Sequence, residues 1–210
     1  MQAYHAISEV LRAGGSWVYP ILALAALAAF LAVDKTIVFW RYARLPADIL
    51  QLVETYGFAW EELEEKLSGL SEGNYFKRFF RIIIENRDKP AWWVESRAAD
   101  EATLIEKSLA KRLWLIETVV TAAPLIGLLG TISGMIGSFR VFGGNGQIDP
   151  SAVTGGVAEA LISTALGIFV ALLALFTFNY YSALLTSVLD EVERLGTRLN
   201  DHIRLDQEKP

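Results

Sequence analysis

The first two apolar stretches of the chain are long enough to cross a bilayer. The first is predicted at 16–42, where apolar residues are interrupted only by Asp34 and Lys35 before the pattern resumes. The second is predicted at 113–140, which has no charged residue from Thr118 to Phe139. About 20 helical residues at ~1.5 Å each cover the ~30 Å hydrocarbon core, so both segments are long enough to span it.

A third apolar stretch, predicted to span the bilayer at 152–189, contains a single charge, Glu159. The uncharged residues after it would form ~45 Å of helix, which is more than the bilayer core needs. We therefore expect this helix to leave the membrane and continue as a helical tail at 190–210. The tail keeps an apolar stripe at helical spacing, made of Val192, Leu195, Leu199 and Ile203.

The segments between the spans complete an all-α membrane fold. Residues 1–15 are predicted to form a short amphipathic helix on the outer surface, and 141–151 a loop between the second and third spans. Residues 43–112 are predicted to be a helical region, and its last helix is expected to run from about Trp92 into the second span without a break. The other predicted helices lie between Pro46 and Gly57, between Trp60 and Leu67, and between Asn74 and Asn86.

Basic residues set the expected orientation, because they concentrate on the cytoplasmic side of membrane proteins. Twelve lysines or arginines lie from Arg41 to Arg112. The loop between the second and third spans has only Arg140 beside it, and the N-terminal segment only Arg12. We expect the N-terminus outside, the C-terminus in the cytoplasm, and both 43–112 and the tail in the cytoplasm.

Composition narrows the function classes. Hydrophobic residues make up 53% of the chain, and the net charge of -5 comes from scattered residues, so neither a soluble enzyme nor a nucleic-acid partner is favoured. The chain has no cysteine, and the two histidines, His5 and His202, lie near opposite ends. We therefore expect no catalytic site, no metal site and no cofactor.

Small residues recur at helical spacing in the second and third spans. Such residues let helix backbones approach closely within a membrane, and simple helix packing is the favoured interpretation of the glycines. The predicted packing positions are Pro124, Gly127, Gly130, Gly134, Gly156 and Gly167.

Thr131 and Thr164 are candidates for a polar ring. Thr131 lies 16 residues before Gln147, near the centre of the loop, and Thr164 lies 17 after it. In an antiparallel hairpin the two hydroxyls would share one depth, where they could bind a proton or a partner's carboxyl group. Alternatively, each hydroxyl bonds to a backbone carbonyl one turn back in its own helix.

Glu159 is the acidic group inside the third span. A carboxylate at such a depth costs ~2.5 kcal/mol or more unless it faces protein or water. Ser163, four residues later, shares its helical face and could share a proton with it or satisfy it. A role in an ion pathway and a structural hydrogen bond both remain open.

Two sequence motifs resemble signatures of the MotA/TolQ/ExbB proton-channel family, most closely its ExbB and TolQ branches. One is Thr121-Ala-Ala-Pro-Leu-Ile-Gly-Leu-Leu-Gly-Thr131-Ile-Ser-Gly-Met, and the other is Gly156-Val-Ala-Glu159-Ala-Leu-Ile-Ser-Thr164-Ala-Leu-Gly167. With the three-span layout, the resemblance covers essentially the whole chain. The sequence departs from many members in having Asp34-Lys35 where they have Glu-Arg.

The resemblance implies a bacterial inner-membrane protein that assembles as a ring of five copies. It implies a pore lined by the second and third spans, which holds a dimer of ExbD-like single-span subunits whose aspartate binds protons. Thr131 and Thr164 match the pore-lining hydroxyls, and Glu159 matches the acid of the third span. Force would pass through a TonB-like protein to the outer membrane. A TolQ-like subunit is the main alternative, followed by a MotA-like stator and a non-conducting scaffold.

Overall fold

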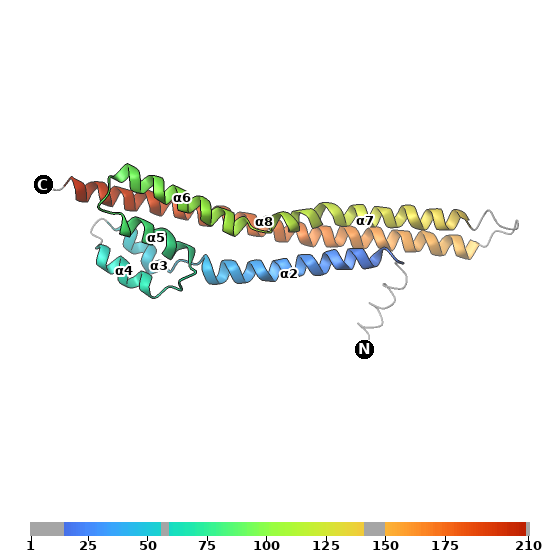
Figure 1. Cartoon of the computed structure of the whole chain (residues 1–210). Coiled ribbons are helices and arrows are strands. Elements are labelled where there is room, and N and C mark those ends of the chain that lie inside the picture. The colour runs from blue at the N-terminus through green and yellow to red at the C-terminus, as the bar shows by residue number, and fades with distance from the viewer. Residues whose placement is uncertain (1–14, 56–58, 141–149, 209–210) are drawn as a thin grey trace. The chain divides into compact units, whose positions relative to one another are not determined.

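The computed structural model describes residues 15–55, 59–140 and 150–208. The helix predicted at 1–15 and the loop predicted at 141–151 lie almost entirely outside these residues. All regular structure in the described part of the chain is helical (Figure 1). Three of these helices are long and apolar enough to span a membrane: Val18–Tyr42, a stretch within Ala91–Phe139, and a stretch within Thr154–Gln207.

The described chain divides into two units. The first, the apolar unit, contains the start of α2 (Val18–Tyr42) as far as Ala32, all of α7 (Leu113–Arg140), and α8 (Pro150–Gln207) as far as Tyr180. In this unit α7 and α8 run antiparallel, side by side (Figure 1). Large apolar side chains such as Leu125, Phe139 and Phe176 are exposed on its surface. Such a surface requires lipid or other protein to cover it.

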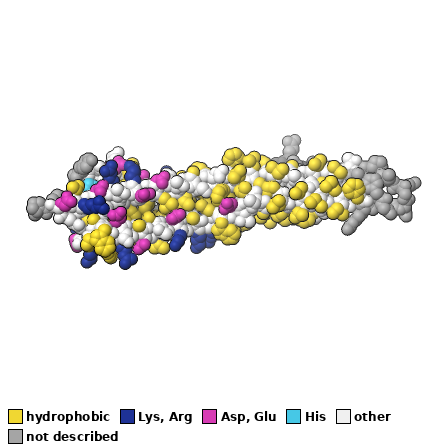
Figure 2. Space-filling view, turned by 90° about the horizontal axis from the view of Figure 1, so that it is seen from above, with side chains coloured by type: hydrophobic (Ala, Val, Ile, Leu, Met, Phe, Trp, Pro, Cys, Tyr) yellow, Lys and Arg dark blue, Asp and Glu magenta, His cyan; other side chains and the backbone are white. Residues whose placement is uncertain are grey.

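The second unit, the charged unit, contains the end of α2, the four helices between α2 and α7, and the end of α8. The charged side chains visible in Figure 2 gather on this unit, interspersed with other residues. The four helices are α3 (Ala47–Glu54), α4 (Trp60–Ser68), α5 (Tyr75–Glu85) and α6 (Ala91–Ala110).

The core of the charged unit forms because each helix turns an apolar face inward. Phe76, Phe79 and Phe80 on α5 are buried against its neighbours, and α5 packs on α6. The stripe predicted in the tail, which includes Leu195 and Leu199, is fully buried, and α8 continues as one helix to Gln207. The tail is therefore held by burial of one face rather than by helix propensity alone.

Asn74 fixes the start of α5. Its Oδ1 accepts hydrogen bonds from the backbone amides of Phe76 (2.9 Å) and Lys77 (3.2 Å), and its Nδ2 donates to the Arg44 carbonyl (2.9 Å). The first two bonds satisfy amides that have no partner within the helix. The third ties this end of α5 to the segment that follows α2.

The structure interrupts the helix that the sequence predicts to be continuous from Trp92 into the second span. α6 ends at Ala110 and α7 begins at Leu113, and Arg112 between them adopts a left-handed φ of 68°. Neither glycine nor proline marks this break. Lys35, buried on α2, donates from its Nζ to the Leu109 carbonyl at 2.5 Å and so satisfies a carbonyl near the end of α6.

Candidate functional site

Glycines bring the backbones of α7 and α8 into contact. A Cβ atom added to Gly167 would lie 2.5 Å from the Ala123 carbonyl oxygen, and one added to Gly127 would lie 2.9 Å from the Ser163 carbonyl oxygen. These neighbours are main-chain atoms, which cannot rotate away from a new side chain. Only glycine fits at these two positions at the observed separation of the helices.

The contact continues toward the end of α7. A Cβ added to Gly130 would lie 2.7 Å from the Ser163 Cβ, and one added to Gly134 would lie 2.9 Å from the Gly156 carbonyl oxygen. Ser138 is buried there and donates to the Gly134 carbonyl at 2.9 Å. The five predicted packing glycines, Gly127, Gly130, Gly134, Gly156 and Gly167, therefore all lie in the interface between α7 and α8.

Pro124 lies inside α7, one residue after the buried Ala123. Its ring removes the backbone N–H that would bond to the carbonyl of residue 120, which weakens the helical ladder at that point. Pro124 is partly buried and directly follows Ala123, whose carbonyl oxygen lies at the close approach of α7 and α8.

Thr164 joins the two helices by a hydrogen bond. Its Oγ1 donates to the Gly127 carbonyl on α7 at 2.9 Å, so the bond is neither to a partner nor to its own helix. The α-helical pattern directs the amide of Thr131 to the same carbonyl, four residues before it. Gly127 O therefore accepts from both of the threonines that the sequence singles out.

Thr131 donates from its Oγ1 to the Leu128 carbonyl of its own helix at 2.7 Å, and its side chain is partly exposed. Gly130 faces Ser163, and the two threonines are the next residues after these. The register therefore places Thr131 and Thr164 within about one helical turn, ~5 Å along the axis.

The hydroxyl hydrogens of both threonines are committed to backbone carbonyls, so each oxygen has only its lone pairs to offer. In this arrangement the threonines accept hydrogen bonds and do not donate them to a third group. They can bind water or a protonated carboxyl group, but they give no hydrogen bond to a carboxylate.

Glu159 is partly buried on α8, and its carboxylate lies against Gly15, just before the start of α2. Gly15 has a φ of 64°, which favours glycine, and a Cβ atom there would overlap the Glu159 carboxylate. Ser163 lies one turn further on and is buried against Gly130. No pattern in the sequence connects Gly15 with Glu159, because 144 residues separate the two positions.

A sequence model of the MotA/TolQ/ExbB proton channel family matches residues 71–194, more than half of the chain. Among curated proteins, the biopolymer transport protein ExbB of Xanthomonas campestris is 40% identical over 106 residues, which cover 50% of this chain and 42% of that protein. The Tol-Pal system protein TolQ of Haemophilus influenzae is 37% identical over 110 residues, which cover 51% of this chain and 48% of that protein. These alignments span less than half of each relative.

A longer alignment is found with a Synechocystis protein named as biopolymer transport protein ExbB-like 3. It is 34% identical over 181 residues, which cover 82% of this chain and 83% of that protein. Together with the three apolar helices, these relatives identify an integral membrane protein. The chain belongs to the MotA/TolQ/ExbB proton channel family.

Proposed function

We propose that this chain is the channel subunit of an ExbB-type motor in the bacterial inner membrane, with its N-terminus outside and its C-terminus in the cytoplasm. Five copies form a ring around a dimer of ExbD-like single-span subunits. Protons pass between the ring and an acidic group of that dimer, and the resulting movement reaches the outer membrane through a TonB-like protein. At ~150 mV each proton releases ~3.5 kcal/mol, so several protons can drive one conformational step.

The observation that carries the proposal is the pair of hydroxyls on the α7–α8 hairpin. Thr131 and Thr164 lie within about one turn and present only lone pairs. A protonated carboxyl group that enters between them can donate its one O–H to either threonine oxygen, whereas an ionised carboxylate gains no hydrogen bond from them. The pair therefore favours the protonated form of a partner's acid within the membrane, as a proton-transfer step requires.

Glu159 extends the same pathway in this proposal. It lies on α8 on the face of Ser163, about one turn from Thr164 toward the loop end of the hairpin. Its contact with Gly15 puts its carboxylate beside the start of α2. A carboxylate at this level can pass protons between the outside and the hydroxyl pair.

Replacing Thr131 with valine tests the channel assignment, with Thr177→Val as the matched control. Thr177 is also on an apolar-unit helix, and its hydroxyl also donates only to its own backbone, at Leu173 O (2.8 Å). Each change removes one oxygen and keeps the side-chain volume. The chain is reconstituted in vesicles with its ExbD-like partner, and proton flux is measured. We expect flux to fall in Thr131→Val only, and equal flux in both variants would contradict the assignment.

A TolQ-type subunit of the Tol-Pal envelope system is the second candidate, because TolQ of Haemophilus aligns over nearly the same share of the chain as ExbB of Xanthomonas. The ExbB assignment is preferred because the long alignment, over 82% of the chain, is to an ExbB-like protein. Co-purification from the native organism separates the two: an ExbD-like partner supports the first and a TolR-like partner the second.

Orientation is tested by labelling. Single cysteines are introduced at Gly144 and at the exposed Ser71, and an impermeant thiol reagent is applied to intact spheroplasts. The proposed topology predicts that only the cysteine at 144 reacts. Reaction at 71 before lysis would reverse the orientation.

A further inference from the structure

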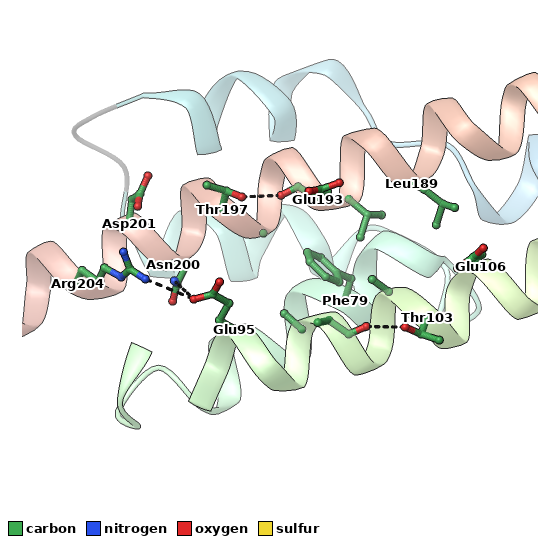
Figure 3. Close-up of a pocket in the computed structure, with 15 residues that line it drawn as sticks. Phe79, Glu95, Thr103, Glu106, Leu189, Glu193, Thr197, Asn200, Asp201 and Arg204 are labelled. Atoms are coloured by element: carbon green, nitrogen blue, oxygen red, sulfur yellow. Dashed lines mark hydrogen bonds and ion pairs between the residues drawn. The ribbon is translucent and has the colours of Figure 1, made fainter. Parts of the chain in front are cut away.

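A groove of about 600 Å³ runs between α6 and α8 in the charged unit, and the proposed proton pathway does not use it. Its α6 wall extends from Glu95 to Glu106, twelve residues that span ~16 Å of helix. The opposite wall is the part of α8 from Leu189 to Arg204. Phe79 lies in its middle (Figure 3), and alanines such as Ala102 also line it, so the groove has an apolar part.

Carboxylates lie toward both ends of the groove. Glu95 and Asp201 lie at one end and Glu106 lies at the other, while Glu193 lies between them on α8, at about the level of Phe79 (Figure 3). Among the described residues that line the groove, Arg204 is the one cation. It lies 3.4 Å from the Glu95 Oε2, and more than half of its side chain is exposed, so this ion pair holds Glu95 weakly.

The neutral polar groups of the groove also present acceptors. The Thr103 hydroxyl donates to Ala99 O and the Thr197 hydroxyl donates to Glu193 O, both at 3.0 Å, which leaves only their lone pairs for a ligand. Apart from Arg204 and the Asn200 amide nitrogen, the polar lining is therefore made of hydrogen-bond acceptors.

Asn200 shows that one acceptor lacks a donor. Its side chain is 7% exposed, and its Nδ2 donates to the Glu95 carboxylate at 3.2 Å. Because a carboxylate only accepts, this bond fixes the orientation of the amide and directs Oδ1 elsewhere. Oδ1 is buried and has no hydrogen-bond partner. A buried carbonyl oxygen without a donor from the protein is costly, so a ligand that donates a hydrogen bond to it gains free energy.

We propose that this groove binds a basic segment of a partner protein through two arginine side chains joined by a short apolar stretch. A guanidinium carries five N–H donors in a planar fork, so one arginine can reach both a carboxylate and the Asn200 carbonyl. The second arginine pairs with Glu193 and Glu106 further along the groove, and the segment between the two arginines covers the apolar part. The proposal does not depend on the channel function.

Fluorescence anisotropy of the full-length protein in detergent micelles tests this with a labelled peptide. The peptide carries two arginines five positions apart, which are ~16 Å apart when it is extended. We expect binding, and no binding of the same peptide with citrulline in place of arginine. Equal binding of the citrulline peptide would overturn the proposal, because citrulline keeps the shape and removes the charge.

Matched variants locate the site. The double variant Glu106→Gln with Glu193→Gln should weaken binding about tenfold. Glu61→Gln with Glu64→Gln removes the same charge from exposed α4 residues and should change binding less than about twofold. Equal losses in the two double variants would mean non-specific attraction to an acidic surface and would overturn the proposal.

Asn200→Leu removes the acceptor without changing the charge. It should weaken binding about fivefold without lowering the midpoint of thermal unfolding, because the variant also removes an unsatisfied buried oxygen. Unchanged affinity would exclude Asn200 from the site.

Two competition experiments identify other occupants. Spermidine that competes as strongly as the peptide would assign the groove to a free polyamine. Peptide binding that vanishes as the protein concentration rises would assign the groove to a second copy of this chain. Each of these outcomes overturns the proposal.

Discussion

Replacing Gly167 with alanine should force α7 and α8 apart. The new Cβ would lie 2.5 Å from the Ala123 carbonyl oxygen and 3.2 Å from the Gly127 Cα. Ordinary van der Waals contact begins at 3.4 Å, so the helices must separate by about 0.9 Å (3.4 - 2.5) at this point. Because both neighbours are backbone atoms, no change of rotamer can relieve the overlap.

The magnitude follows from three contributions. Overpacking costs ~1–3 kcal/mol. The same separation stretches the 2.9 Å bond from Thr164 to Gly127 O beyond hydrogen-bonding distance, and such bonds between membrane helices average ~0.6 kcal/mol. Alanine restores ~1 kcal/mol of helix propensity relative to glycine. We therefore expect a net loss of roughly 1–2 kcal/mol in the free energy of unfolding.

Gly137→Ala is the matched control, because an added Cβ there meets no atom within 4 Å. The same substitution on α7 should stabilise the protein by up to ~1 kcal/mol through helix propensity alone. Stability is measured by titrating a denaturing detergent into mixed micelles and following tryptophan fluorescence. The two variants should shift the midpoint in opposite directions. A Gly167→Ala protein as stable as Gly137→Ala would refute the close approach of α7 and α8.

Three further predictions concern single positions. Gly15→Ala places a residue with a strained backbone against the Glu159 carboxylate and should reduce proton flux in vesicles. Unchanged flux would show that the contact between Gly15 and Glu159 is not needed for transport. Lys77, and next Arg81, lower the pKa of Glu72 below its ordinary 4.5, so its stabilising contribution exists above that pH and is lost as the pH falls through the lowered value. In thermal unfolding, Glu72→Gln should therefore be less stable than wild type at pH 7, and the difference should disappear as the pH falls through the lowered pKa of Glu72. Arg112→Gly should raise the free energy of unfolding by about 0.5–1 kcal/mol by removing left-handed strain, and a decrease would show that the Arg112 side chain contributes more than its backbone costs.

The helices of this protein follow from periodicity because one face of each must be buried. Leu195 and Leu199, spaced four apart, predict the helical tail, and the structure buries both completely. The small residues around Gly127 predict close helix packing, and the structure places this glycine against the backbone of α8. In both cases the residues that pack together are spaced three or four apart along one helix, and this spacing can be read from the sequence.

Contacts between residues far apart in the chain leave no such pattern. The break between α6 and α7 has no glycine or proline, and the Lys35 side chain that binds Leu109 O comes from 74 residues earlier. The bond from Thr164 to Gly127 O depends on a side-chain rotamer and on the helix register, neither of which its own helix specifies. The environment of Asn200 is equally invisible in the sequence. Its amide donates to Glu95 on α6, 105 residues earlier, and its Oδ1 is buried without a hydrogen-bond partner.

Because Gly127 O accepts from both the Thr131 amide and the Thr164 hydroxyl, the structural and functional effects of each threonine can be separated by mutation. Thr164→Val removes a hydrogen bond that joins two helices, but Gly127 O keeps the Thr131 amide and is not left without a donor. The structural cost is therefore close to the ~0.6 kcal/mol of one interhelical bond rather than the larger cost of an unsatisfied buried carbonyl. Thr131→Val removes a bond within one helix, and Leu128 O keeps its own helical donor, so the cost there is smaller still. Because neither change leaves a buried carbonyl unpaired, a large loss of proton flux in a variant that keeps its stability must come from the lone pairs that the hydroxyl presented to the pathway.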